Sequence, residues 1–196
     1  MAVKRPESRQ QMPEDATLVF KGKLFDVYQW QQQMYDGTYS TFEKLKRPDT
    51  VVVFGVLDDG SILLTKQQQP GKTTYIAAAG GRVDDGEDIE AAAVRELLEE
   101  TGYQARELKL WHSEQPTSKI DWAVFVFIAK GLEKIDGQRL DAGEKINLYP
   151  VTFDEFVDTA LKDDFAEYEI LRLIYEAKMN KQKMEELRAL FRPISK

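Results

Sequence analysis

Three glutamates at helical spacing are the feature of this sequence best suited to chemistry. Glu96, Glu99 and Glu100 lie in a stretch, residues 91–100, that is rich in strong helix formers and is followed by Gly102. At roughly 100° per residue, the three carboxylates share one face of the predicted helix. Carboxylates this close repel one another, and Mg²⁺ or Mn²⁺ relieves the repulsion because such ions take oxygen ligands. The spacing therefore indicates a divalent-metal site.

Residues around the helix strengthen this interpretation. Gly80 and Gly81 let the backbone come close to a metal or phosphate, because glycine has no side chain in the way. Arg95 can hold a neighbouring carboxylate through a forked hydrogen-bond pair. A glutamate-rich run on its own is usually a solvated helix face. The functional interpretation is favoured because three other features occur at fixed distances from the run. They are the glycine pair, the isolated Glu87 and the Thr-Gly end at Gly102.

The stretch from Gly81 to Tyr103 resembles the signature of the Nudix hydrolases, Gly-x5-Glu-x7-Arg-Glu-U-x-Glu-Glu-x-Gly-U, in which U is a bulky aliphatic residue. Every fixed position matches, and only the last U departs, as Tyr103. The resemblance implies that a nucleoside diphosphate linked to another group is cleaved with water and a divalent metal. It assigns metal binding to Glu96, Glu99, Glu100 and the carbonyl of Gly80, and a supporting role to Glu87 and Arg95.

Composition limits the other classes of function. A length of 196 residues predicts one domain, with room for an appendage and a sizeable core. The net charge of −7 argues against broad binding to a nucleic-acid backbone. The chain has no cysteine, which excludes disulfides and suits the cytoplasm. No apolar run approaches membrane-spanning length and the polar start lacks a signal-peptide core, so we expect no membrane partner.

The apolar pattern divides the chain into three parts. They are a flexible tail (1–15), an N-terminal antiparallel sheet of three strands (16–48), and a core domain (49–196) that ends in a long helix from Phe165 to about Phe191. The continuous apolar run at 51–57 predicts a strand buried on both faces. Strands mixed with helices give the α/β class, which resembles the Nudix α/β/α sandwich with a mixed sheet.

The N-terminal sheet resembles that of the ADP-ribose and nucleotide-sugar pyrophosphatases. In that group the sheet commonly swaps across a homodimer and contacts substrate in the partner's site, so residues 16–48 are a candidate dimerisation element. Arg47 is the basic residue expected near substrate phosphate or sugar, with an ordinary surface charge as the alternative. Tyr28, Trp30 and Tyr35 have aromatic faces for stacking on a base, and core or dimer packing is the alternative for each.

Some segments depart from that group. Its Arg-Gln-aromatic-Arg is replaced by residues 66–69, Lys-Gln-Gln-Gln, and its Glu-Leu-Pro-Ala-Gly by residues 77–81, which removes an acidic residue near the metal site. Pro116 also lies closer to the signature than the proline that accompanies ADP-ribose specificity. Glutamines such as Gln68 suit a substrate that is recognised by neutral hydrogen bonds. The broader nucleotide-sugar class is therefore favoured over ADP-ribose alone.

The implied chemistry needs a general base close to the attacking water. Metal ions held by the glutamates would neutralise the diphosphate and lower the pKa of that water. Glu144, which follows the flexible Gly143, is the candidate base, and Glu99 is the alternative. An exposed loop glutamate is the simpler explanation of Glu144. His112, beside Trp111 in a predicted strand, is expected to be structural.

Taken together, the residues predict an enzyme that converts a nucleoside diphosphate sugar, ADP-ribose or similar, to a nucleoside monophosphate and a sugar phosphate. The alternative is a non-catalytic Nudix domain that binds a nucleotide sugar as a sensor or regulatory module. Members that only bind tend to have lost signature glutamates, and this chain keeps all of them. The expected partners are the substrate, Mg²⁺ or Mn²⁺ and a second copy of the chain.

Overall fold

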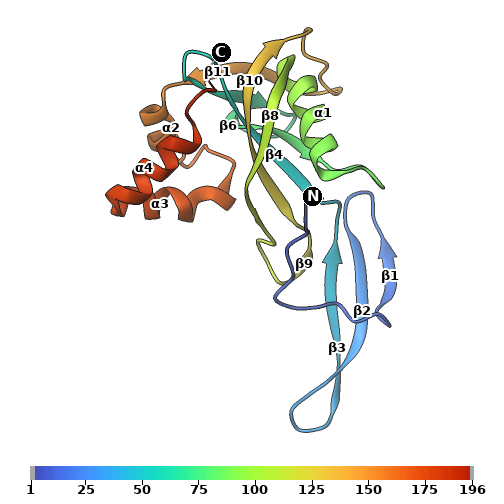
Figure 1. Cartoon of the computed structure of the whole chain (residues 1–196). Coiled ribbons are helices and arrows are strands. Elements are labelled where there is room, and N and C mark those ends of the chain that lie inside the picture. Colours follow the sequence, from blue (N-terminus) through green and yellow to red (C-terminus); the bar gives the residue numbers. More distant parts are fainter. Residues whose placement is uncertain (1–2, 195–196) are drawn as a thin grey trace.

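The computed structural model describes residues 3–194 and contains two sheets, with helices on both sides of the larger one (Figure 1). Residues 1–2 and 195–196, the outer ends of the predicted tail and core domain, lie outside the described residues. The helices are α1 (Ile89–Thr101), α2 (Phe153–Thr159), the 3₁₀ helix η1 (Tyr168–Ile170), α3 (Leu171–Met179) and α4 (Lys181–Leu190). None of these is both long and apolar enough to cross a membrane.

The strands are β1 (Thr17–Lys21), β2 (Asp26–Gln33), β3 (Tyr39–Lys46), β4 (Thr50–Val56), β5 (Ile62–Gln68), β6 (Tyr75–Ala77), β7 (Ala79–Arg82), β8 (Tyr103–Glu114), β9 (Ile120–Asp121), β10 (Val124–Lys134) and β11 (Lys145–Val151). Strands β1–β7 precede α1 along the chain, and β8–β11 lie between α1 and α2. The predicted strand that holds Trp111 and His112 is part of the longer β8. The short β7 and β9 were not predicted.

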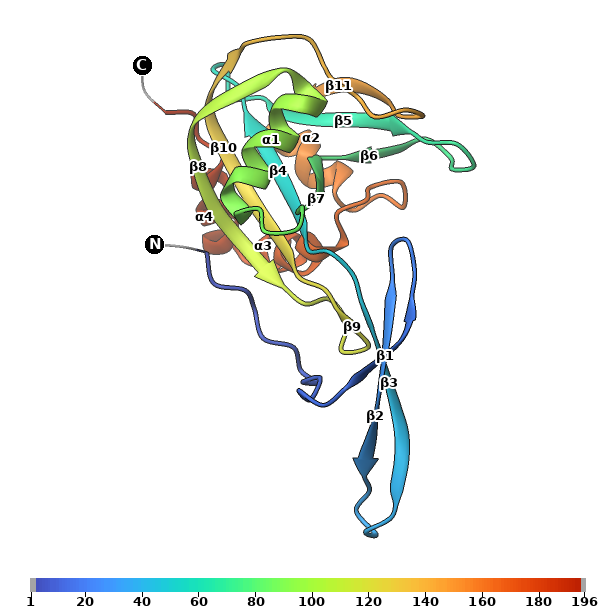
Figure 2. The ribbon, with the colours of Figure 1, turned by 90° about the vertical axis from the view of Figure 1, so that its right-hand side faces the viewer.

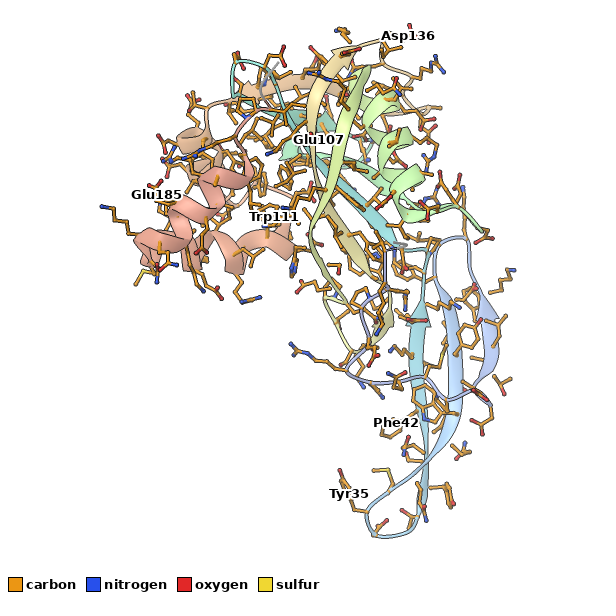
Figure 3. The ribbon with its side chains drawn as sticks, in the orientation of Figure 1. Tyr35, Phe42, Glu107, Trp111, Asp136 and Glu185 are labelled. Carbon is orange, nitrogen blue, oxygen red and sulfur yellow. The ribbon has the colours of Figure 1, made fainter. Side chains whose placement is uncertain are left out.

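The N-terminal sheet projects from the core domain as an arm (Figures 1 and 2). Its order is β1-β2-β3-β9, with β1, β2 and β3 antiparallel and β9 parallel to β3 at Leu45 and Ile120. The predicted three-stranded antiparallel sheet is therefore confirmed, with one short strand added. The β2–β3 hairpin carries the fully exposed Tyr35 at its tip, the part of the arm farthest from the core (Figure 3).

The larger sheet is mixed, as predicted. Its main path is β11-β5-β4-β10-β8, in which β4 and β10 are parallel and the other neighbours antiparallel; β6 adds to β5, and β7 to β4. Alternate residues of β4 face opposite sides because side chains alternate along a strand. Val51 packs in a core with Leu97 of α1, and Phe54 packs on the other side with Phe156 of α2. The strand is thus buried on both faces.

Aromatic rings join the C-terminal helices to the second face of the sheet. Phe191, just after α4, lies 5.5 Å from Trp111 of β8 and 5.1 Å from Phe156, measured between ring centroids. Figure 3 shows Trp111 between β8 and these helices. With α1 on one face and α2, α3 and α4 on the other, the predicted α/β/α sandwich is present.

The prediction of one long helix from Phe165 to about Phe191 is wrong. The segment forms η1, α3 and α4. The helix is interrupted between α3 and α4 at Asn180, whose backbone is extended (φ −141°, ψ 115°). The Asn180 side chain accepts a hydrogen bond from the backbone N–H of Lys183 at 3.1 Å and so caps α4. Asparagine competes with the helix backbone in this way and favours a new N-terminus over continuation.

The segment predicted as a flexible tail is held against the domain from residue 3 onward. Arg5 forms a forked pair with Asp49 at 2.7 and 2.9 Å and a salt bridge with Asp121 at 2.9 Å. The buried Lys44 donates a hydrogen bond to Ser8 at 2.7 Å. These partners lie at least 36 residues away in the sequence, so local composition does not reveal them.

Candidate active site

Helix α1 presents the predicted acidic face and begins and ends at specific capping residues. The Asp88 side chain accepts hydrogen bonds from the N–H groups of Glu90 and Ala91, and Gly102 ends the helix in the left-handed conformation (φ 76°). Both caps satisfy backbone groups that a helix end leaves without partners. The buried Ala93 and Leu97 hold α1 on the sheet. This packing turns the acidic face toward the strands that precede the helix.

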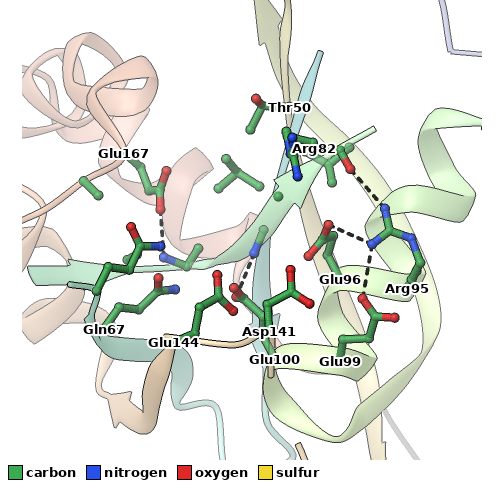
Figure 4. A pocket seen from close by; sticks show the side chains of 18 of the residues that line it. Thr50, Gln67, Arg82, Arg95, Glu96, Glu99, Glu100, Asp141, Glu144 and Glu167 are labelled. Carbon is green, nitrogen blue, oxygen red and sulfur yellow. Dashed lines mark hydrogen bonds and ion pairs between the residues drawn. The ribbon is translucent and has the colours of Figure 1, made fainter. Parts of the chain in front are cut away.

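Arg95 gathers the carboxylates of the signature (Figure 4). Its Nε and Nη2 donate to the two carboxylate oxygens of Glu87 at 2.9 Å each, a forked pair. Its Nη1 donates to Glu96 at 2.8 Å and to Glu99 at 3.2 Å. The Arg95 bond lowers the pKa of Glu87 below its ordinary value. Arg95 therefore ties the loop before α1 to the acidic face of the helix.

Glu100 points away from this network and toward the strand before the helix. Its carboxylate accepts a hydrogen bond from the Gly80 N–H at 3.0 Å and is almost fully buried. Burial raises its pKa to about 8, because a buried carboxylate loses hydration, and the charges of Glu96 and Glu144 add to the shift. Burial likewise raises the pKa of Glu96. Acidic side chains packed this closely favour a bound cation.

A cleft of about 520 Å³ opens over these residues. Seven segments line it: the first half of β4, the end of β5, β6 with β7, the loop between β7 and α1, α1 itself, the loop between β10 and β11, and the loop before η1. Among the described lining residues are seven carboxylates and three arginines. They are Asp84, Glu96, Glu99, Glu100, Asp141, Glu144 and Glu167, and Arg82, Arg95 and Arg139. The excess of carboxylates disfavours a bare polyphosphate and suits one that arrives with metal ions.

The structure brings some of the other predicted residues into the cleft. Glu144, the candidate base, lines it from the β10–β11 loop, where Gly143 (φ 97°) makes the turn and the Glu144 N–H bonds to Asp141 O at 3.1 Å. Gly80 lines the cleft next to Glu100. His112 lies on β8 outside the cleft, with Nε2 at 3.4 Å from a carboxylate oxygen of Glu114. The spatial grouping of the signature with Glu144 was predicted from the sequence.

Four predicted substrate contacts do not line the cleft of this chain. Gln68 is exposed on the opposite side of β5, because alternation along the strand turns Gln67 and Gln69 into the cleft instead. Trp30 is buried against Phe42 at 6.0 Å, and Tyr28 lies beside it on the arm. These side chains lie outside the cleft of their own chain, and their contact with a substrate stays a prediction.

Arg47 does not line the cleft, but it contacts a residue that does. Its guanidinium carbon lies 4.7 Å from the centroid of the Trp122 ring, and its Nη2 is 3.5 Å from Oγ1 of Thr50, which does line the cleft. Burial and the nearby charge of Arg82 lower the pKa of Arg47. The stack on Trp122 explains why a cation so close to the cleft does not enter it.

Several lining residues were not predicted as site residues, and Tyr75, Gln67 and Glu167 are three of them. Tyr75 and Gln67 are linked by a hydrogen bond from the Tyr75 hydroxyl to the Gln67 side-chain oxygen at 2.9 Å. Glu167, in the loop before η1, accepts a hydrogen bond from the Ala78 N–H at 3.0 Å. The glutamine run at 67–69 was a signal for Gln67. No feature of the sequence around Glu167 indicated a site residue, because its partner Ala78 lies 89 residues away.

The donor set fits a hard divalent ion in chemistry, although the side chains are not arranged as a closed cage. In the part of the chain that the structure describes, no group of three or more acidic or histidine side chains converges closely enough to hold an ion. The reason is that Arg95 attracts Glu96 and Glu99, while Glu100 bonds to Gly80. Carboxylate oxygens on one helix face are nevertheless the ligands that Mg²⁺ and Mn²⁺ prefer.

The comparisons with known proteins identify the family. Residues 46–174 match the NUDIX domain. The chain therefore belongs to the Nudix family, and it is a Nudix hydrolase with the signature intact. The resemblance predicted from residues 81–103 is confirmed.

Individual relatives cover most of the chain. An ADP-ribose pyrophosphatase from Bacillus subtilis (strain 168) is 34% identical over 140 residues, which are 70% of this chain and 76% of that protein. A methanol dehydrogenase activator from Bacillus methanolicus is 28% identical over 141 residues, with the same two coverages. A crystal structure of an ADP compounds hydrolase has a TM-score of 0.71 at 20% identity and covers 96% of this chain and 99% of that one. This last likeness confirms the predicted fold.

Proposed function

We propose that the protein hydrolyses the diphosphate of a nucleoside diphosphate sugar such as ADP-ribose, giving a nucleoside monophosphate and a sugar phosphate. The observation that carries the proposal is the cleft in which Glu96, Glu99 and Glu100 face strand β7, which contains Gly80 and Gly81. The relative from Bacillus subtilis, an ADP-ribose pyrophosphatase by name, supports the substrate class. Turnover of a panel of nucleotide sugars, with identification of the products, tests the proposal.

The same residues are the proposed ligands of Mg²⁺ or Mn²⁺, together with the carbonyl of Gly80. A bound divalent ion supplies charge neutralisation at the diphosphate oxygens and makes water a stronger nucleophile. Arg95 and Glu87 act by positioning: their forked pair holds the loop, and the remaining Arg95 bonds orient Glu96 and Glu99. Glycine at 81 leaves room for Glu96, since a Cβ there would lie 2.3 Å from the Glu96 oxygen.

Glu144 is the proposed general base, which takes a proton from the attacking water. We expect Glu144→Gln to lower kcat by about 10²–10⁴-fold with little change in KM, the usual range for loss of a general base. Rates of Glu144→Gln and Glu99→Gln across pH 5–9 check this. The general base would instead be Glu99 if two results were found together. Glu144→Gln would keep the full rate, and Glu99→Gln would be inactive although it still binds the metal.

A regulatory role is the second candidate, and the named activator among the relatives supports it. In that case the cleft binds a nucleotide sugar without cleaving it. The complete set of signature glutamates favours hydrolysis, because a module that only binds has no need of a base or of the Arg95 network. Binding without turnover across the panel would support the regulatory role instead.

We propose that the arm, residues 16–48, forms a homodimer. Its edge strand β1 exposes Val19 and Phe20, whose side chains are 50% and 61% accessible, and an apolar edge strand is suited to pairing with another chain. Strand β2 lies on the arm that projects from the core domain (Figure 2), so we propose that Tyr28 contacts the partner's cleft in the dimer, whereas the buried Trp30 packs against Phe42.

Light scattering coupled to gel filtration tests the homodimer. We expect twice the mass of one chain for the wild type and the mass of one chain for Phe20→Ser. Tyr175→Ser, which changes an equally exposed aromatic residue on α3, serves as the control and should stay dimeric. A monomeric wild type at micromolar concentration would contradict the proposal.

A further inference from the structure

One end of the cleft lies away from the Arg95 network and has a different chemical character. Figure 4 shows Gln67 and Glu167 on the side of the cleft opposite Arg95 and Glu99, with Glu144 and Glu100 between them. Tyr75 lines the same end. Burial, and to a lesser extent the charges of Glu100, Glu144 and Glu167, raise the pKa of Tyr75. This end thus offers hydroxyl, amide and carboxylate groups.

Backbone hydrogen bonds hold the Glu167 carboxylate beside the site. Its Oε1 accepts from the Ala78 N–H at 3.0 Å, and two residues further along the same segment the Gly80 N–H binds Glu100 at 3.0 Å. Glu167 and Glu100 are therefore neighbours along one edge of the cleft, although they come from different parts of the chain. The loop that carries Glu167 is itself fixed, because the Ala166 N–H bonds to Ile76 O at 2.8 Å.

A second set of hydrogen bonds fixes Tyr75 and Gln67. The Tyr75 hydroxyl donates to the Gln67 oxygen, the Gln67 amide donates to Thr65 Oγ1 at 3.0 Å, and Thr65 donates to Ala77 O at 3.0 Å. Thr65 and Gln67 are buried. Because the Tyr75 proton is already used, its oxygen is left to accept a hydrogen bond. The second oxygen of Glu167 forms no hydrogen bond with the described residues and is also left as an acceptor.

We propose that Glu167, with Tyr75, forms a subsite for the hydroxyl groups of the sugar half of the substrate, and that Glu167 determines specificity by accepting hydrogen bonds from neighbouring hydroxyls. This inference rests on the proposed hydrolysis of nucleotide sugars. With the diphosphate at Glu96, Glu99 and Glu100, a substituent that extends toward Glu167 meets acceptors. An additional phosphate would bring only further acceptors to this end, whereas hydroxyl groups supply the donors that these acceptors lack.

The test compares two substrates with the same scissile bond. One is ADP-ribose, and the other is an ADP ester of a simple alkyl alcohol, which has no hydroxyl groups in that half. We expect the wild type to prefer ADP-ribose by at least about 30-fold in kcat/KM, because an analogue without hydroxyls leaves the polar groups of the site unpaired. In Glu167→Ala the preference should shrink to about threefold, through loss of rate on ADP-ribose alone.

Two further variants keep the test decisive. Glu167→Gln retains the shape and the bond from Ala78 but replaces one acceptor with a donor, so we expect it to lower the preference about fivefold. Asp163→Asn, an exposed change in the same loop, should leave the preference unchanged. An unchanged preference in a folded Glu167→Gln or Glu167→Ala enzyme, or an equal loss on both substrates, would overturn the assignment.

Failure of the proposed function would give a different result. If the wild type hydrolyses neither compound, calorimetry with the same pair measures the preference as a ratio of dissociation constants. A preference for ADP-ribose that disappears in Glu167→Gln then supports the subsite while hydrolysis is refuted. Equal affinity of the wild type for the two compounds would overturn the subsite as well.

Discussion

The Glu100→Gln enzyme should fold normally and hydrolyse its substrate about 10²–10³-fold more slowly than the wild type, the loss typical of removing one preorganised electrostatic contact. The fold is expected to survive because burial raises the pKa of Glu100 to about 8, so the metal-free protein already holds an uncharged carboxyl there at neutral pH. The Gln oxygen can accept the same hydrogen bond from Gly80. What is lost is the ability of the side chain to give up its proton and bind a cation as a carboxylate.

Stability measurements on metal-free protein test the electrostatic part of this argument. The pKa of Glu100 is raised from its usual 4.5 to about 8 in the folded state, so the folded protein binds the proton more tightly than the unfolded one. The free energy of unfolding should therefore fall as pH rises from about 4.5 to about 8. Urea unfolding in the presence of a chelator should show a weaker fall for Glu100→Gln.

The control for both measurements is Glu90→Gln, which changes an exposed glutamate in the first turn of the same helix. It should keep the wild-type rate and the wild-type dependence of stability on pH. Near-normal turnover by Glu100→Gln would refute its role as a metal ligand. An identical fall in stability for Glu100→Gln and wild type would refute the assigned cause of the raised pKa.

Alanine substitutions at Gly80 and Gly81 of β7 should have different effects, one on stability and the other on the catalytic rate. A Cβ at Gly81 would lie 2.3 Å from a carboxylate oxygen of Glu96, the far end of a flexible side chain that can move. A Cβ at Gly80 would lie 2.3 Å from the backbone oxygen of Val51 in the central strand, which cannot. Gly81→Ala should therefore displace Glu96 from Arg95 and the cleft, whereas Gly80→Ala should strain the sheet.

We expect Gly81→Ala to keep its stability but lose about 10²-fold in kcat, as for a lost electrostatic contact in the site. Gly80→Ala should lose about 1–3 kcal/mol of unfolding free energy, the usual cost of overpacking. Thermal unfolding and turnover of both variants provide the measurement. Full activity of Gly81→Ala would show that the position of Glu96 is unimportant, and an unchanged melting temperature of Gly80→Ala would contradict the close approach to Val51.

Local spacing made the central part of the site predictable from the sequence. Helix geometry places residues three and four apart on one face, so Glu96, Glu99 and Glu100 had to lie together once α1 formed. The caps at Asp88 and Gly102 are also local signals. The break at Asn180 carried a signal of the same kind, since asparagine is a frequent N-cap residue.

Contacts between distant segments were not predictable in this way. Glu167 approaches Ala78 only because the chain returns across the sheet. It supplies an acidic group beside residues 77–81, the segment that lacks the glutamate of the Glu-Leu-Pro-Ala-Gly pattern. Gln68 was named for the substrate, whereas Gln67 lines the cleft, because alternation along β5 depends on where the strand begins. Arg5 is held by Asp49 and Asp121 through the same kind of long-range contact.

The central claim is hydrolysis of a nucleotide-sugar diphosphate in the cleft over α1. The most direct measurement incubates the purified protein with Mg²⁺ and, separately, ADP-ribose, GDP-mannose, UDP-glucose and dinucleoside polyphosphates, and identifies the products. We predict equal amounts of nucleoside monophosphate and sugar phosphate from at least one nucleotide sugar, formed about 10²–10³-fold more slowly by the Glu100→Gln protein. Intact substrate across the whole panel, with binding detected by calorimetry, would contradict the claim.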